Sequence, residues 1–75
     1  MPKIPRIIGE EAVRAFRKAG FTLDRIKGSH HILRRERWPF RLSIPVHGGK
    51  TLGVGLLKSQ IEAAGLTVEE FCELL

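Results

Sequence analysis

The sequence predicts an α+β two-layer sandwich, in which a three-stranded antiparallel sheet carries helices on one of its faces. Two observations lead to this fold class. Apolar residues recur at helical spacing towards both ends of the chain, whereas its middle alternates apolar and polar residues as strands do. Glycine-containing turns separate these stretches. The expected order is α-β-β-β-α-α, with the second sheet face open to water or a ligand.

A chain of 75 residues has room for one small core, so residues 1–75 are expected to form a single domain. The hydrophobic fraction of 43% and the charged fraction of 28% are typical of soluble globular proteins. No apolar run is long enough to cross a bilayer, and residues 1–5 lack the apolar core of a signal peptide. We therefore expect a cytoplasmic protein that is not bound to a membrane.

The first helix is expected over Gly9–Ala19, after an extended arm formed by Met1–Ile8. Glu10 and Glu11 lie in its first turn, where the positive end of the helix dipole favours them, and Gly20 ends it as a C-cap. The apolar positions at helical spacing are Ala12, Val13, Phe16 and Ala19.

Three strands are expected next, over Phe21–Arg25, His30–Arg35 and Arg41–Val46. The Lys27-Gly28-Ser29 segment breaks the chain between the first two strands. Pro45 cannot donate a ladder hydrogen bond, which predicts that the third strand lies at an edge or ends there. The residues expected to point inward from this strand are Leu42, Ile44 and Val46.

A second helix is expected to bury Leu57, Ile61 and Ala64, which recur at i, i+4 and i+7, with Gly65 as its C-cap. A third, short helix begins at Thr67, where Glu70 completes a capping box. The single cysteine, Cys72, cannot form an internal disulfide, and we interpret it as a small apolar filler of this last helix.

The positive charge is concentrated in one part of the chain. The formal net charge is +5 and the pI is about 10.2, which favours a polyanionic partner. Residues 25–50 carry seven basic and one acidic side chain, whereas residues 66–75 carry three acidic and none basic. The basic segment contains two adjacent histidines, His30 and His31, directly after Gly28 and Ser29.

The histidine pair has the setting that RNA cleavage requires. RNA can be cut without metal when a base removes the proton of the 2′-hydroxyl, and histidine suits this step because its ordinary pKa lies near neutral pH. Lys27, Arg34 and Arg35 are near enough in sequence to bind the phosphate or stabilise its charge. Strand alternation places His30 and His31 on opposite faces but does not decide which one faces solvent. A surface or structural role for both histidines remains open.

The order of short motifs along the chain resembles the HicA family. Gly-Ser-His-His at 28–31 heads a strand, Ile-Pro-Val-His-Gly at 44–48 closes the next, and Ala-Ala-Gly-Leu-Thr at 63–67 ends a helix, with Glu-Glu-Phe at 69–71 behind it. HicA proteins are small mRNA interferases of bacterial and archaeal type II toxin–antitoxin pairs, with a fold like the double-stranded-RNA-binding domain. The resemblance extends from about Glu11 to Phe71.

The resemblance implies a metal-independent endoribonuclease without a cofactor, which blocks translation by cutting single-stranded regions of mRNA. It also implies a HicB-like antitoxin that covers the active surface. By position the catalytic histidine that follows the Gly-Ser pair is His30, with His31 as the alternative base. Leu33 stands where the family commonly has an aromatic residue, so base stacking is not expected there. The expected RNA-binding residues are Lys27, Gly28, Ser29, Arg34, Arg35, Lys50 and Lys58.

Other interpretations compete with this one. We interpret His47 as a turn residue whose ring bonds loop backbone rather than as a second catalytic residue. For Trp38 and Phe40 three roles compete, which are stacking on bases, capping the core and contacting a protein partner, and we favour the partner. A zinc site built from all three histidines is disfavoured because neighbours on a strand diverge. The alternative function is a non-catalytic RNA-binding module of the same fold, and a third is a purely protein-binding module.

Overall fold

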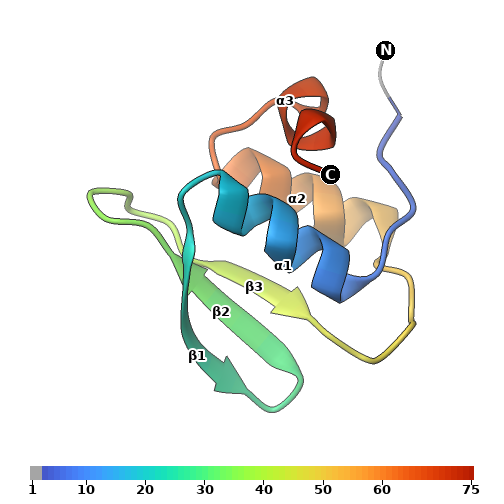
Figure 1. Cartoon of the computed structure of the whole chain (residues 1–75), viewed down its shortest axis with the longest axis horizontal. Coiled ribbons are helices and arrows are strands. Elements are labelled where there is room, and N and C mark those ends of the chain that lie inside the picture. The colour runs from blue at the N-terminus through green and yellow to red at the C-terminus, as the bar shows by residue number, and fades with distance from the viewer. Residues whose placement is uncertain (1–2) are drawn as a thin grey trace.

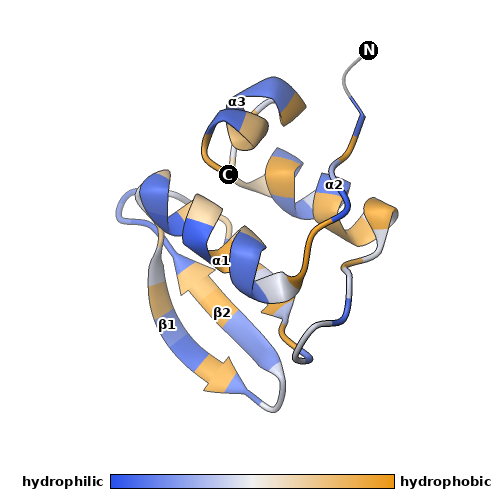
Figure 2. Ribbon diagram, turned by 45° about the vertical axis from the view of Figure 1, so that its right-hand side comes forward, coloured by the Kyte–Doolittle hydropathy of each residue, from blue (hydrophilic) through white to orange (hydrophobic). Residues whose placement is uncertain are grey.

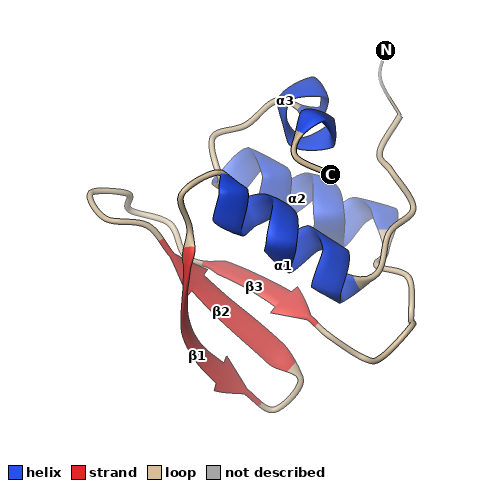
Figure 3. Ribbon diagram, in the orientation of Figure 1, coloured by secondary structure: helices blue, strands red, loops and turns tan. Residues whose placement is uncertain are grey.

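The computed structural model describes residues 3–75 and confirms the expected fold class and element order. The three strands form one antiparallel sheet in the order β1-β2-β3. Figure 1 shows the helices gathered on one side of this sheet, with the β1–β2 hairpin extending beyond them, and Figure 3 shows the same division into layers by element type. The elements are α1 (Gly9–Lys18), β1 (Thr22–Lys27), β2 (His30–Arg34), β3 (Leu42–Pro45), α2 (Val54–Ala63) and α3 (Val68–Glu73).

The pairing of the strands fixes which side chains share a face, because residues directly opposite each other point the same way. On the helix-covered face, β2 and β3 contribute His31 opposite Ile44 and Leu33 opposite Leu42. On the open face they contribute His30 opposite Pro45 and Ile32 opposite Ser43. Leu33, Leu42 and Ile44 are completely buried, so the core lies between the helices and this face of the sheet.

Close packing of α1 brings the helix layer onto the sheet. The Phe16 ring lies 4.8 Å from the Phe71 ring and 6.2 Å from the Phe21 ring, centroid to centroid. At the start of the helix, a Cβ atom on Gly9 would overlap the carbonyl oxygen of Pro45. Glycine therefore lets α1 begin directly against the end of β3.

The predicted ends of the elements agree with the structure to within about two residues, the usual uncertainty of helix and strand ends. Gly20 and Gly65 follow α1 and α2 with positive φ angles of 102° and 77°, as C-terminal caps require. The capping box of α3 is confirmed: Thr67 Oγ1 accepts from Glu70 N at 3.0 Å, and Glu70 Oε1 accepts from Thr67 N at 2.8 Å. Pro45 is the last residue of the edge strand β3, as expected.

Two sequence-based interpretations of the fold are wrong. Cys72 is exposed rather than a core filler, because α3 turns the neighbouring Phe71 into the core and Cys72 lies about 100° further round the helix. A β-bulge at Asp24 breaks the simple alternation of the first strand, so that Leu23 pairs with Leu33 but Arg25 pairs with Ile32. The bulge therefore moves Arg25 to the open face.

The arm and β1 lie at opposite margins of the fold. Within the arm, Ile7 O accepts from Leu52 N at 2.8 Å, and Ile8 pairs with Thr51, while residues 1 and 2 lie outside the described part. Every residue of β1 is exposed, including Leu23 at 42% and Ile26 at 55%. Figure 2 shows β1, with hydrophobic segments between hydrophilic ones, beside rather than beneath the helices. No helix within residues 3–75 is long and apolar enough to cross a membrane.

Candidate functional site

The turn before β2 sets the position of the first histidine. Lys27 pairs with His30, so Gly28 and Ser29 form a two-residue hairpin loop. Gly28 has a positive φ of 63°, which fits the first central position of a type II′ turn, where glycine is preferred. A Cβ atom at Gly28 would meet nothing within 4 Å. The backbone before His30 is thus open to the close approach of a ligand.

The two histidines lie in different surroundings. His30 is exposed on the open face. His31 is half-buried on the helix-covered face, and its Nδ1 is buried without a hydrogen-bond partner among residues 3–75. Its ring lines a hollow beside α1 together with Glu10, Val13, Arg14, Arg17, Leu23 and Val46. Of the two residues, only His30 combines free access to solvent with a place on the open face.

Three cationic side chains share the open face with His30. Lys27 is its cross-strand partner, Arg25 pairs with Ile32 of β2, and Arg34 is the last residue of the same strand. All three are exposed. Sequence reasoning identified Lys27 and Arg34 but missed Arg25, because alternation without the bulge assigns it to the opposite face.

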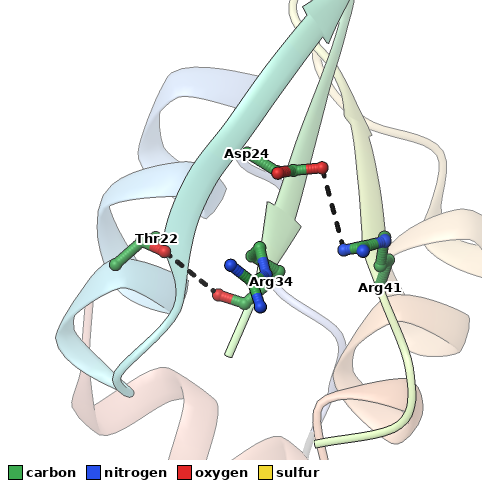
Figure 4. Close-up of polar contacts among 4 residues, drawn as sticks. All are labelled: Thr22, Asp24, Arg34 and Arg41. Carbon is green, nitrogen blue, oxygen red and sulfur yellow. Dashed lines mark hydrogen bonds and ion pairs between the residues drawn. The ribbon is translucent and has the colours of Figure 1, made fainter. Parts of the chain in front are cut away.

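Asp24, the extra residue of the bulge, compensates part of this charge. Its Oδ2 lies 3.7 Å from Arg41 Nη1, across β2 (Figure 4). Figure 4 also shows Thr22 Oγ1 donating to the carbonyl oxygen of Arg34 at 3.4 Å. The Asp24–Arg41 pair is half-exposed and long, so it contributes little to stability and leaves Arg41 available to an anion.

A hollow of about 440 Å³ lies at the end of β2 opposite His30. It is lined by Trp38, Pro39 and four arginines, Arg34, Arg35, Arg37 and Arg41. Cations gathered around one concavity concentrate positive potential and attract polyanions. From His30 to Arg34, β2 spans about 13 Å. The open face therefore joins a histidine at one end to an arginine-lined hollow at the other.

Arg35 is held by the fold. Its guanidinium stacks between the rings of Phe21 and Trp38, 4.7 and 4.6 Å from their centroids, and donates to Ala19 O at 3.1 Å. Trp38 in turn donates from Nε1 to Ala63 O at 2.8 Å. Both side chains thus tie the β2–β3 loop to the helix layer, whereas Phe40 stays 56% exposed. Packing contacts account for the positions of Arg35 and Trp38, and contact of Arg35 with RNA stays a prediction.

The remaining predicted residues lie around the β1–β2 turn and on α2. The ring of His47 contacts a side chain rather than the loop backbone expected for it, with Nε2 3.1 Å from Ser29 Oγ. Lys50 is exposed beside His47, in a third hollow. Lys58 is exposed on α2, away from the strands that carry the histidines. The structure therefore groups Lys27, Ser29 and Lys50 near His30 and leaves Lys58 apart.

Chemically, this arrangement offers an exposed imidazole that can take a proton, with cations nearby that can hold a phosphate. Among residues 3–75, no three histidine, cysteine or acidic side chains come together as metal ligands. A family model described as the HicA toxin of bacterial toxin–antitoxin matches residues 9–66, most of the chain. No curated protein gives a match to this sequence.

Proposed function

Because the chain belongs to the HicA family of bacterial toxin–antitoxin toxins, we propose that it is an endoribonuclease that cuts mRNA in the cytoplasm and so blocks translation. The observation that carries this proposal is the position of His30. Within residues 3–75, it is exposed beside an open glycine turn, on a sheet face that carries three exposed cations and is not covered by a helix.

His30 is the general base of the proposed reaction. Its imidazole removes the proton of the 2′-hydroxyl, and the resulting oxyanion attacks the adjacent phosphorus. Lys27, directly across the strand, lies where it can stabilise the negative charge that builds on the phosphate oxygens. His31 is less suited to this role, since its ring is turned towards α1 and its Nδ1 is buried.

The open face also suggests a path for the RNA. A single strand that places one phosphate at His30 and follows β2 reaches the arginine-lined hollow after about 13 Å, roughly two nucleotides. Arg25 and Arg34 lie along this path. Cations at both ends support binding that depends strongly on salt, as expected where phosphate contacts supply the affinity.

We propose a HicB-like antitoxin as the partner that restrains this activity. A partner that covers the open face would hide His30 and neutralise the cations around it. The exposed Phe40, beside the arginine-lined hollow, offers an apolar contact to such a protein. Acidic side chains on the antitoxin would complement the arginines of the hollow.

The test compares cleavage of mRNA by wild-type protein, His30→Ala and the matched control His31→Gln, each with EDTA present. We expect wild-type protein and His31→Gln to cut, and His30→Ala to be slower by about 10²–10⁴-fold, the usual contribution of a general base. Equal rates for His30→Ala and wild type would exclude His30 as the base. Loss of wild-type cleavage in EDTA would exclude the metal-independent mechanism. RNA binding by wild type with no cleavage under any condition would instead favour the non-catalytic module.

A further inference from the structure

We propose that His47 is the general acid of the same reaction, delivering a proton to the 5′-oxygen that leaves the phosphorus. This inference rests on the proposed ribonuclease function. A 5′-alkoxide is a poor leaving group, so cleavage is accelerated when a second group protonates that oxygen as the bond breaks. Among residues 3–75, His47 is the one further histidine whose contacts tie it to the turn that carries His30.

Two hydrogen bonds join the segment of His47 to this turn. Ser29 O accepts from Val46 N at 2.8 Å, which extends the β2–β3 pairing by one residue beyond Pro45. Ser29 Oγ lies 3.1 Å from His47 Nε2. In the imidazolium form, Nε2–H donates to this hydroxyl, which orients the ring and leaves Nδ1–H for the leaving oxygen. Ser29 thus contacts His47 and directly precedes His30.

The pairing of β2 with β3 brings the two histidines near each other. His30 is directly opposite Pro45, and Val46 continues the pairing by donating to Ser29 O, so His47 is the second residue beyond the partner of His30. Residues diagonal to each other across two paired strands lie about 7–8 Å apart. Both side chains are exposed. A phosphodiester can lie between them, with its 2′-oxygen towards His30 and its 5′-oxygen towards His47.

A hollow beside His47 offers room for the departing nucleoside. Its volume is about 240 Å³, and Pro45 and His47 both contribute to its wall. Lys50 lines it as well and is held by its backbone N–H, which donates to His47 O at 3.0 Å. The remaining lining residues are Thr51, Leu52 and Gly53. The RNA downstream of the scissile bond can therefore continue past His47 with a cation beside it.

The proposed step conserves atoms and charge. His30 accepts the 2′-hydroxyl proton, the 2′-oxygen forms a bond to phosphorus, and the bond from phosphorus to the 5′-oxygen breaks. His47 gives its proton to that oxygen. The products are a 2′,3′-cyclic phosphate and a free 5′-hydroxyl, and exchange of protons with water returns both rings to their starting forms.

The charged groups beside His30 and His47 are Lys27, which is paired with His30 across the strands, and Lys50, which lines the same hollow as His47. Both are cationic, and the phosphate of bound RNA is the anion that they would contact. We therefore expect rate to depend on two ionisations, falling at low pH when the base is protonated and at high pH when the acid has lost its proton.

The test uses one RNA in two forms, with oxygen or sulfur as the bridging 5′-atom at the cleavage site. A thiolate leaves without being protonated, so the sulfur form does not need the acid. We expect His47→Ala to cut the oxygen form about 10²–10³-fold more slowly than wild type and the sulfur form at nearly the wild-type rate. His30→Ala should be slow on both. His47→Ala should also lose the fall in rate at high pH.

Equal slowing of His47→Ala on both RNAs would overturn the assignment. A second variant, His47→Gln, keeps a group that can bond Ser29 but cannot deliver a proton, so we expect it to behave as His47→Ala does. Wild-type rates for His47→Gln on the oxygen form would show that the ring only holds the turn, and would also overturn the proposal. If wild-type protein cuts neither RNA, the ribonuclease function itself fails, and this inference fails with it.

Discussion

The two faces of the sheet are made by the same strands but differ in what surrounds them. On the helix-covered face Leu33, Leu42 and Ile44 are completely buried, and this apolar area excluded from water stabilises the fold. On the open face His30 and Arg34 remain exposed. Removing a residue from the first face should cost stability, and removing one from the second should cost activity or binding. Adjacent residues of β2 therefore have different consequences when mutated.

The histidine pair is the sharpest instance of this difference. His30 and His31 are neighbours of the same type, yet one faces solvent and cations and the other faces α1. The two side chains point to opposite faces simply because successive side chains of a pleated strand alternate. What distinguishes them is only that helices cover one side.

The largest effect expected on stability is that of Leu33→Ala. Removing a completely buried leucine side chain should lower the free energy of unfolding by about 2–5 kcal/mol, because it leaves a cavity. The matched control is Ile32→Ala, on the open face, where the side chain is only half-buried and the loss should stay below about 1 kcal/mol. Urea unfolding of both variants measures the difference. Equal losses would mean that the helices do not divide the two faces as described.

A smaller effect is expected from His31→Phe. The variant removes a buried nitrogen that has no hydrogen-bond partner among residues 3–75. Burial of such a group costs about 1–3 kcal/mol, so the free energy of unfolding should rise by about 1 kcal/mol. Cleavage of mRNA should stay within a few fold of wild type. At His30 the same substitution should leave stability unchanged and slow cleavage by about 10²–10⁴-fold. Thermal unfolding and a cleavage assay separate the two, and a His31→Phe protein that no longer cuts would contradict the assignment of the base.

The smallest effect is expected from Lys27→Ala, on the open face. Loss of one phosphate contact should weaken binding of a non-cleavable RNA by about threefold to tenfold and reduce the slope of log affinity against log salt by about 0.7. Arg17→Ala is the control, since Arg17 is exposed on α1 and lines the hollow of the other side. Fluorescence anisotropy at several salt concentrations measures both. A reduced slope for Arg17→Ala but not for Lys27→Ala would show that RNA binds the helix-covered side, and would contradict binding to the open face.

Much of the fold could be predicted because local patterns agree with the final packing. The helical spacing around Phe16, the capping box at Thr67 and the glycine turn at Gly28 each depend on a few neighbouring residues. The bulge could not be predicted in this way, because a distant contact decides it. No residue near Asp24 indicates a bulge, since the bulge depends on how β1 pairs with β2.

The candidate site also has a part that could be predicted from the sequence and a part that could not. Composition located the positive segment and the histidine pair, and the order of motifs indicated the family. The contact between Ser29 and His47, 18 residues apart, could not be predicted, since it arises only when β3 pairs with β2 and ends beside the turn. Nor could the stacking of Arg35 between Phe21 and Trp38.

The sequence by itself determined the elements, their order, the turn that starts β2 and the alternation that sends His30 and His31 to opposite sides. Only the tertiary structure decided which side of β2 is open, because Ile32 and Leu33 are both apolar and the choice depends on where α1 and α2 dock. Burial of Leu33 against the helices is the outcome. A slip of one residue in register would exchange the two histidines, and the apolar core prevents it.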